Sequence, residues 1–281
     1  LGEKIKSLFF KKNFPKQKIN VPMKIYKKIY SKIFYRDKII SYSGPFTNWQ
    51  KAIKYSKGYD NRKILNEVLK NTLISKNNLY FFERDGSLLK NNTISYTQLG
   101  IILDMIMKKR RGLNIVDYGG SLGSNYFKIK DIIDQKYKNT WNIIEQKAFV
   151  NLGKKKLGEK NFKFLNDMSQ IKKKVDIFML SGTLQYLENP HKILKNIFKL
   201  KPEVILLERL PMCKKIKKNN IYIQKRGSNS YPSWIFLDSF IRLIFKKNRY
   251  FLYKTLKPEF DHNLYLKNEK INFCGYMYKR D

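Results

Sequence analysis

The spacing of hydrophobic residues changes near residue 111. Before it, two stretches carry apolar residues at helical spacing: Ile64, Leu65, Val68, Leu69 and Leu73, then Leu99, Ile102, Met105 and Ile106. After it, short apolar runs alternate with helical stretches. The runs predict strands over residues 114–118, 141–145, 162–165, 175–180 and 204–208, followed by a helix over 233–246 and strands near 250–255 and 273–278.

Strands that alternate with helices indicate an α/β fold, because each crossover helix covers a face of a parallel sheet. We therefore expect a Rossmann-like fold with a seven-stranded, mostly parallel sheet and helices on both faces. The domain would span residues 111–281. Residues 1–110 would form a basic, helical N-terminal extension.

This extension contains two distinctive segments. Apolar residues between Ile25 and Phe34 recur at helical spacing with lysines mainly opposite, which suits a helix on an anionic membrane or one packed on its own domain. Residues 44–60 are aromatic and interrupted by glycine, with Trp49 and Gly58-Tyr59-Asp60. We expect a short helix between loops here, acting as a mobile lid that excludes water when it closes.

Charge narrows the classes of partner. The 59 Lys and Arg against 22 Asp and Glu give a net charge of +37, which favours nucleic acid, an anionic membrane surface or an acidic substrate. A Lys-rich overall composition would produce the same excess without any such role. The 42% hydrophobic and 15% aromatic residues indicate a globular chain and argue against global disorder.

Cysteine and histidine are scarce. Cys213 and Cys274 are far apart, which fits a reducing compartment and gives no zinc motif. His191 and His262 are also too widely separated in sequence to indicate a metal centre. Because neither a membrane-spanning stretch nor a signal sequence is evident, we expect a cytoplasmic protein, with peripheral contact at the inner face of the membrane left open. A removed segment upstream of Leu1 also stays open.

The clearest chemical motif follows the strand over 114–118. This strand leads into a glycine-dense turn that precedes a helix near Ser124, as in nucleotide-binding folds. Because glycine has no Cβ, it permits positive φ and lets a ligand approach the backbone. The candidate binding residues in this turn are Asp117, Gly119, Gly120, Ser121 and Gly123.

Polar residues also end the next three strands. Glu145 ends the second strand, where a carboxylate can accept hydrogen bonds from both ribose hydroxyls. Asn166 and Asp167 end the third and could address the amine of an adenine, and Ser181 opens the turn after the fourth. Because ligands bind outside the carboxyl ends of such strands, these residues would share one site.

The order Asp-x-Gly-x-Ser-x-Gly, Glu, Asn-Asp and Ser-Gly-x-Leu-Gln-Tyr resembles the class I S-adenosylmethionine-dependent methyltransferases over residues 111–281. With Trp49, Gly58-Tyr59-Asp60 and Arg209-x-Pro211, nearly the whole chain resembles a little-characterised group of bacterial methyltransferases associated with surface-polysaccharide genes. The resemblance implies S-adenosyl-L-methionine as cofactor and a sugar or glycan precursor as acceptor. Ser121 replaces the usual middle glycine, as in the closer group, but a degenerate turn that does not bind stays open.

On this reading the chain would catalyse O-methylation of a sugar hydroxyl. Glu208 and His262 are the candidate bases, and Arg209 could hold an acidic or phosphorylated acceptor in a bidentate grip. Tyr59, Tyr186 and Tyr231 could line the pocket. Of these tyrosines, Tyr59 is also expected to contribute to cofactor binding.

Two alternatives remain. The charge would suit an RNA or DNA methyltransferase. However, the chain has Ser181-Gly-Thr-Leu-Gln-Tyr where base amino-methyltransferases resemble one another in Asn/Asp-Pro-Pro-aromatic, so we expect nucleic acid to bind only nonspecifically. A non-catalytic nucleic-acid- or membrane-binding protein that retains the fold is the other alternative.

Overall fold

The structure is a computed structural model that describes residues 40–57, 61–78, 81–90, 96–133, 137–213, 216–226, 229–256, 264–266 and 269–281. Its α-helices are α3 (Trp49–Lys54), α4 (Asn61–Asn77), α5 (Tyr96–Lys109), α6 (Ser124–Ile133), α7 (Lys147–Lys156), α8 (Pro190–Lys199) and α9 (Asp238–Lys247), with short 3₁₀ helices η2 (Met168–Gln170) and η3 (Leu184–Tyr186). The predicted N-terminal helix around Ile25–Phe34 lies outside the described residues.

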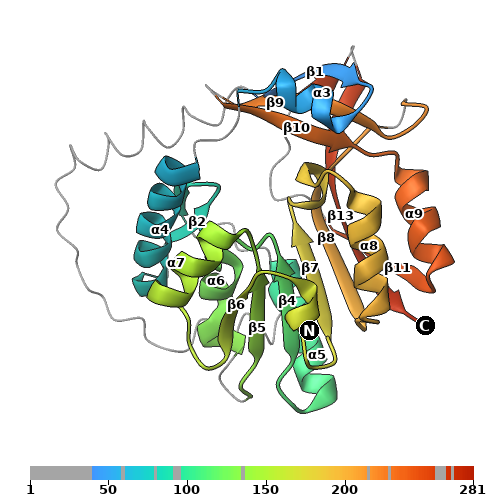
Figure 1. The fold of residues 1–281 in the computed structure, drawn as a ribbon. Coiled ribbons are helices and arrows are strands. Elements are labelled where there is room, and N and C mark those ends of the chain that lie inside the picture. The colour runs from blue at the N-terminus through green and yellow to red at the C-terminus, as the bar shows by residue number, and fades with distance from the viewer. Residues whose placement is uncertain are drawn as a thin grey trace. The chain divides into compact units, whose positions relative to one another are not determined.

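The strands fall into a large sheet and two smaller ones (Figure 1). Those of the large sheet are β4 (Asn114–Tyr118), β5 (Thr140–Ile144), β6 (Phe162–Leu165), β7 (Ile177–Ser181), β8 (Val204–Met212), β11 (Tyr250–Leu256), β12 (Leu264–Leu266) and β13 (Glu269–Arg280). A three-stranded sheet contains β1 (Ile40–Phe46), β9 (Asn220–Arg226) and β10 (Asn229–Ile235), and a hairpin contains β2 (Phe81–Arg84) and β3 (Ser87–Lys90).

Seven strands of the large sheet follow the order β11-β13-β8-β7-β4-β5-β6, and β12 pairs with β13. The strands from β6 to β8 are parallel, whereas β13 is antiparallel to both β8 and β11. This arrangement confirms the predicted seven-stranded, mostly parallel sheet. The chain turns back between β4 and β7, so the crevice where Rossmann-like folds bind ligands lies at the carboxyl ends of these two strands.

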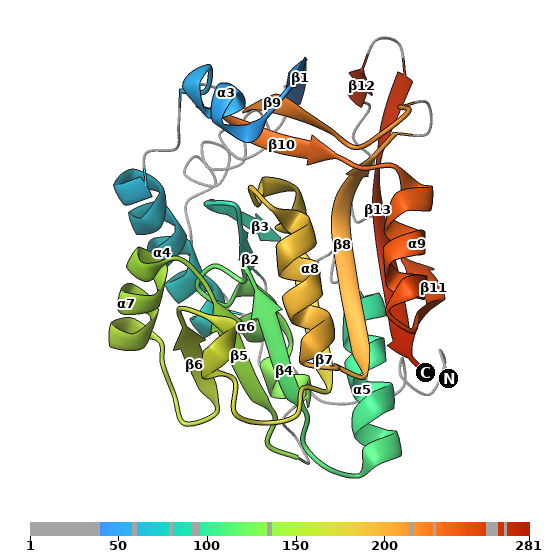
Figure 2. The same ribbon diagram turned by 45° about the vertical axis from the view of Figure 1, so that its right-hand side comes forward.

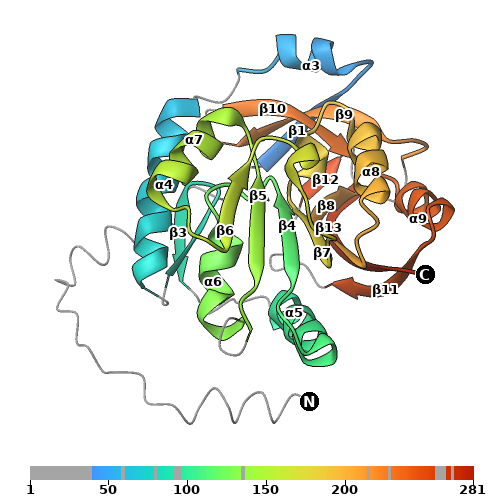
Figure 3. The same cartoon turned by 60° about the horizontal axis from the view of Figure 1, so that its bottom comes forward.

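Both faces of the sheet are covered by helices, as predicted. Leu194 and Ile197 of α8 and Ile241 and Phe245 of α9 pack in one buried cluster with residues of the central strands. Figures 2 and 3 show α5 and α6 on the opposite face from α8. Burial on both faces explains why β7 and β8 begin with continuous apolar runs and do not alternate.

Two sequence predictions require correction. The helix expected over residues 233–246 begins only at Asp238, because Asn229–Ile235 pairs with β9 along its whole length. Residues 44–46, expected to lie in a loop, belong to β1, which also pairs with β9. Three of the strands, β1, β2 and β3, lie in the segment for which only helices were predicted.

The three-stranded sheet and α3 form a cap, which we define as residues 40–54, 220–226 and 229–235. The cap contacts the loop after β7: Trp234 Nε1 donates to Leu187 O at 3.0 Å, and Gln50 Nε2 donates to Glu188 Oε1 at 2.9 Å. Figure 2 shows the cap beyond the end of the large sheet to which the β4 arrow points. The switch point of the sheet therefore faces the cap.

Candidate cofactor and acceptor site

The turn between β4 and α6 is closed by tight packing. Gly119, Ser121 and Gly123 have φ of +73°, +55° and +92°, which is the left-handed region that favours glycine. A Cβ on Gly119 would lie 2.3 Å from Thr183 Cγ2, and one on Gly123 would lie 2.3 Å from Phe162 Cζ. The two glycines thus let the turn pack against β6 and the loop after β7, while Ser121 holds a conformation that costs a non-glycine residue energy.

Asp117 lies buried directly beneath this turn. Its Oδ2 accepts a hydrogen bond from Asn125 Nδ2 at 3.1 Å, and Oδ1 is buried without a hydrogen-bond partner among the described residues. Burial, together with the charges of Glu208 and Glu145, raises the pKa of Asp117 to about 7, although the hydrogen bond from Asn125 opposes this. Gly120 leaves room for this carboxyl group, because a Cβ there would lie 2.7 Å from Asp117 Cγ.

Glu145 links the end of β5 to the same turn. Its Oε1 accepts from Ser121 N at 3.2 Å and its Oε2 from Gln146 N at 2.8 Å. Burial raises the pKa of Glu145, although both backbone hydrogen bonds oppose this. Burial, Asp167 and Glu145 also raise the pKa of Tyr118, so both carboxylates act on this tyrosine at the end of β4.

Asn166 and Asp167 are exposed and directly precede the short helix η2, of which Asp167 is the N-cap. Their backbone amides donate to Gln170 Oε1 at 2.8 and 3.3 Å, and Asp167 Oδ1 accepts from Ser169 N at 2.8 Å. This capping hydrogen bond lowers the pKa of Asp167. The Asp167 carboxylate at this edge is therefore oriented by the helix that it caps.

Ser181 at the end of β7 is paired in register with Glu208 in the middle of β8, which continues to Met212. Ser181 O accepts from Arg209 Nη2 at 2.7 Å, and Gly182 N donates to Glu208 O at 2.9 Å. Gly182 has φ of +68°, and a Cβ there would lie 2.7 Å from Arg209 Cζ. The glycine thus makes space for the Arg209 guanidinium, which crosses the turn after β7.

The β2–β3 hairpin adds a buried carboxylate that the sequence analysis did not identify. Glu83 is 2% exposed, and it accepts hydrogen bonds from Gly86 N at 2.8 Å and from the hydroxyl of Ser124, the first residue of α6. Burial raises the pKa of Glu83 to about 7 against the effect of these hydrogen bonds. The hairpin therefore contributes to the wall of the site beside the glycine-dense turn.

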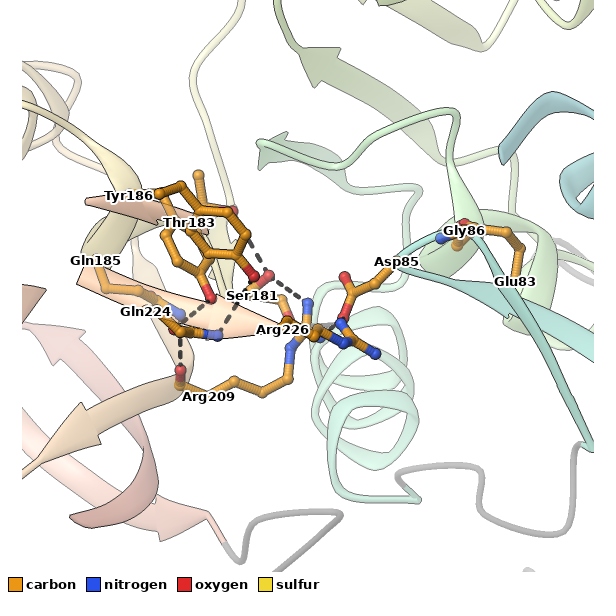
Figure 4. A network of polar contacts seen from close by, with 12 residues as sticks. Glu83, Asp85, Gly86, Ser181, Thr183, Gln185, Tyr186, Arg209, Gln224 and Arg226 are labelled. Atoms are coloured by element: carbon orange, nitrogen blue, oxygen red, sulfur yellow. Dashed lines mark hydrogen bonds and ion pairs between the residues drawn. The ribbon is translucent and has the colours of Figure 1, made fainter. Parts of the chain in front are cut away.

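Asp85, at the tip of the same hairpin, contacts two arginines (Figure 4). Its Oδ2 lies 3.4 Å from Arg209 Nη1 and 3.2 Å from Arg226 Nη1. Asp85-Gly86 between two short apolar stretches is a strong hairpin signal, because both central residues of a type I′ turn need positive φ. The sequence contains that signal. It does not reveal that Arg209 of β8 and Arg226 of β9 contact Asp85.

Gln224 of β9 connects the cap to the loop after β7. Its Oε1 accepts from Tyr186 at 3.1 Å (Figure 4). The same oxygen accepts from Tyr42 at 2.9 Å, and Gln224 Nε2 donates to the Tyr231 hydroxyl oxygen at 3.4 Å. Gln224 is 3% exposed. Two of the three tyrosines predicted to line the pocket, Tyr186 and Tyr231, thus meet at one buried amide.

Most of the predicted site residues gather at the carboxyl edge of the sheet: Asp117, Gly119, Gly120, Ser121, Gly123, Glu145, Asn166, Asp167, Ser181, Glu208 and Arg209. Tyr59 and His262 lie outside the described residues. Among the described residues, no group of three or more His, Cys, Asp or Glu is placed to hold a metal ion. None of the helices in the described part of the chain is long and apolar enough to cross a membrane.

The structure is similar to several solved methyltransferases. One is the 1,6-didemethyltoxoflavin-N1-methyltransferase of Burkholderia thailandensis with bound 1,6-didemethyltoxoflavin and S-adenosylhomocysteine: 10% identity, TM-score 0.43, covering 85% of this chain and 93% of the other. Another is the magnesium protoporphyrin IX methyltransferase of Synechocystis PCC 6803: 15% identity, TM-score 0.44, covering 67% and 84%. A third is an S-adenosylmethionine-dependent methyltransferase of Clostridium acetobutylicum ATCC 824: 11% identity, TM-score 0.44, covering 68% and 92%. No family model matches the sequence, and no curated protein is significantly similar to it.

Proposed function

We propose that the chain is an S-adenosylmethionine-dependent methyltransferase that O-methylates a sugar or glycan precursor. The observation that carries the proposal is the convergence of Asp117 and Glu145 on the glycine-dense turn at the switch point of the sheet. A binding role for this edge explains why Asp117 keeps a buried carboxylate oxygen without a hydrogen-bond partner among the described residues.

The residues at this edge suit the chemistry of the cofactor. Glu145 has the carboxylate needed to accept hydrogen bonds from ribose hydroxyls, and Asp167 has one for the amine of an adenine. When bound, S-adenosylmethionine would supply a methyl group activated by a sulfonium. The buried carboxyl groups of Asp117 and Glu83 would provide a polar, partly ionised wall beside a cationic ligand.

The acceptor would bind between the cap and the middle of β8, where Glu208 and Arg209 lie. Glu208, which is in register with Ser181 at the switch point, is our candidate base for the proton that an acceptor hydroxyl loses. Arg209 would orient an acidic or phosphorylated acceptor. A role in polysaccharide synthesis follows from the sequence resemblance alone.

Binding of S-adenosylhomocysteine tests the proposal directly. Calorimetry should give a dissociation constant that is roughly micromolar, and the ligand should raise the melting temperature by mass action. Glu145→Gln should weaken binding by about 10- to 100-fold, since it removes charge-assisted hydrogen bonds.

Glu159→Gln is the matched control, because Glu159 forms a surface pair with Lys76 at 3.0 Å and its side chain is 42% exposed. It should bind the ligand like the wild type. Absence of both heat and thermal shift at millimolar S-adenosylhomocysteine would refute the proposal.

A further inference from the structure

Two guanidinium groups from different elements converge on one carboxylate oxygen in front of the candidate site. Arg209 comes from β8, Arg226 from β9 of the cap, and Asp85 from the tip of the β2–β3 hairpin (Figure 4). The side chains are 29%, 26% and 41% exposed, respectively, so a small ion can reach them from solvent. The three residues thus form a partly shielded, accessible group of charges.

The contacts of Asp85 are long for charge-assisted hydrogen bonds. Both arginines approach the same oxygen, at 3.4 and 3.2 Å, whereas strong N–H to carboxylate bonds measure about 2.7–2.9 Å. Burial raises the pKa of Asp85, but Arg209, Arg226 and Arg84 together lower it below its ordinary value. The Asp85 carboxylate is therefore ionised and attracted to the arginines. However, its contacts do not have the geometry of the forked pairing that an arginine makes with a free oxyanion.

Arg209 does not depend on Asp85 for its position. Its Nη2 donates to Ser181 O at 2.7 Å, and its guanidinium packs over Gly182, where a Cβ would lie 2.7 Å from Cζ. Because these contacts hold the rest of the guanidinium group, they also fix the position of Nη1, which contacts Asp85. Movement of the hairpin tip would leave this donor where it is.

Tyr186 extends the same group toward the cap. Burial and the charge of Asp85 raise the pKa of its hydroxyl, while Arg209 lowers it, so the hydroxyl is near both charged partners. It donates to Gln224 Oε1 at 3.1 Å. The arginines are thus bordered by hydroxyl and amide groups that suit a polar, hydroxylated molecule carrying an anionic group.

We propose that Arg209 and Arg226 form a site for an oxyanion, carboxylate or phosphate, and that Asp85 occupies this site until such a ligand displaces it. The assignment of the oxyanion to the methyl acceptor rests on the proposed function; the anion site itself does not. Arg226 and Asp85 would then determine specificity for acidic acceptors.

The test titrates inorganic phosphate and, separately, acetate against protein without cofactor at constant ionic strength, following the melting temperature and the phosphorus or methyl NMR signal. Asp85→Asn removes the competing charge but keeps the turn, because Asn-Gly is also favoured there. It should bind the preferred anion about three- to fivefold more tightly than the wild type. Arg226→Gln in the Asp85→Asn background should weaken binding at least about tenfold.

Each variant has a control with the same change in net charge. Asp104→Asn removes the exposed Asp104–Lys108 pair of α5, and Arg242→Gln removes the exposed Arg242–Asp238 pair of α9. Equal affinities for Asp85→Asn and Asp104→Asn, or for Arg226→Gln and Arg242→Gln in that background, would overturn the proposal. Tighter binding of phosphate than of acetate identifies a phosphorylated ligand, and the reverse identifies a carboxylate.

Because cofactor is left out, the result can be read whether or not S-adenosylhomocysteine binds. If the anion site fails while the cofactor binds, Asp85 is a structural ion-pair partner and the methyltransferase proposal stands. If the cofactor fails while the anion site holds, Arg209 and Arg226 recognise an anion in a protein with another activity.

Discussion

Glu83 and Asp117 are buried carboxyl groups that both contact helix α6, Glu83 through Ser124 and Asp117 through Asn125. The N-terminus of a helix favours negative charge. Burial outweighs this effect, since each carboxyl group has its pKa raised to about 7. The charge around the glycine-dense turn therefore changes in the neutral pH range, unlike that of ordinary carboxylates.

Because Glu83 is buried, the stability of the folded protein should depend on pH. Glu83→Gln should make this dependence weaker. The folded protein holds the Glu83 proton up to about pH 7, whereas the unfolded chain releases it near the ordinary pKa of 4.5. The contribution is thus fully present below about pH 4.5 and is lost as the pH rises through 7. For one such group the loss is of the order of 3 kcal/mol in the free energy of unfolding.

Urea unfolding from pH 5 to pH 8 measures the effect. The variant should lose less stability across this range than the wild type, because Gln keeps an acceptor for Gly86 N and a donor for Ser124 but does not titrate. Glu159→Gln, on the surface, should follow the wild type. Parallel curves for Glu83→Gln and wild type would show that the Glu83 carboxyl titrates at its ordinary pKa.

At the scale of elements, the sheet was predictable and the cap was not. Buried parallel strands form short apolar runs in the sequence. Each of the strands β4 to β8 was predicted with its start or its end within a few residues of that in the structure. In contrast, β9 and β10 carry Gln224, Lys225 and Pro232, and the apolar end of β10 was joined to the helix that follows. β10 pairs with β9, its neighbour in the chain, whereas β9 also pairs with β1, which is distant in sequence. A local pattern does not reveal this second pairing.

The same division applies to the site. Asp117, Glu145 and Ser181 were identifiable because each lies at or next to the carboxyl end of a predicted strand, and parallel strands bring these ends to one edge. Arg226 and Asp85 reach that edge from other elements, so only the tertiary structure reveals their contact. Sequence reasoning therefore found the residues of the sheet edge and missed the charged residues that approach it from other elements.

The cap gives a prediction about the lid proposed from the sequence. Ala52 of α3 is fully buried against Ile221 and Ile223 of β9, while its neighbour Ile53 is 46% exposed. Ala52→Glu should detach α3, because an unpaired buried carboxylate costs several kcal/mol. If α3 helps to close the site, S-adenosylhomocysteine should bind about tenfold more weakly than to the wild type.

Ile53→Glu adds the same charge one residue away and should change neither stability nor affinity appreciably. Thermal unfolding and calorimetry on both variants, at a temperature where both are folded, separate the effects. A destabilised but folded Ala52→Glu protein with unchanged affinity would show that α3 is a structural cover and not a lid.

At the scale of the whole molecule, the net charge of +37 bears on which acceptor the protein meets. A protein so basic binds polyanions at low salt whatever its role, so binding alone decides nothing. Neutralising several phosphates nonspecifically loses about 10³–10⁵ in affinity between about 50 and 200 mM salt. An enzyme that acts on nucleic acid should instead keep a preferred sequence or shape near physiological salt.

The acceptor is therefore tested by transfer and not by affinity. Labelled S-adenosylmethionine is offered at about 150 mM salt, where surface charges are screened beyond about 8 Å, with pooled RNA, duplex DNA, and neutral, carboxylated or phosphorylated sugars in separate reactions. We expect label in the acidic sugars, and we expect it to fall in Arg209→Lys, which keeps the charge but loses the planar fork.

Label at one defined nucleotide position, with none in sugars, would reassign the acceptor to nucleic acid while leaving methyl transfer intact. If no class of acceptor is labelled, calorimetry with S-adenosylhomocysteine decides between two explanations. Binding would mean only that the acceptors tried were not substrates, whereas absence of binding would favour a binding protein that retains only the fold.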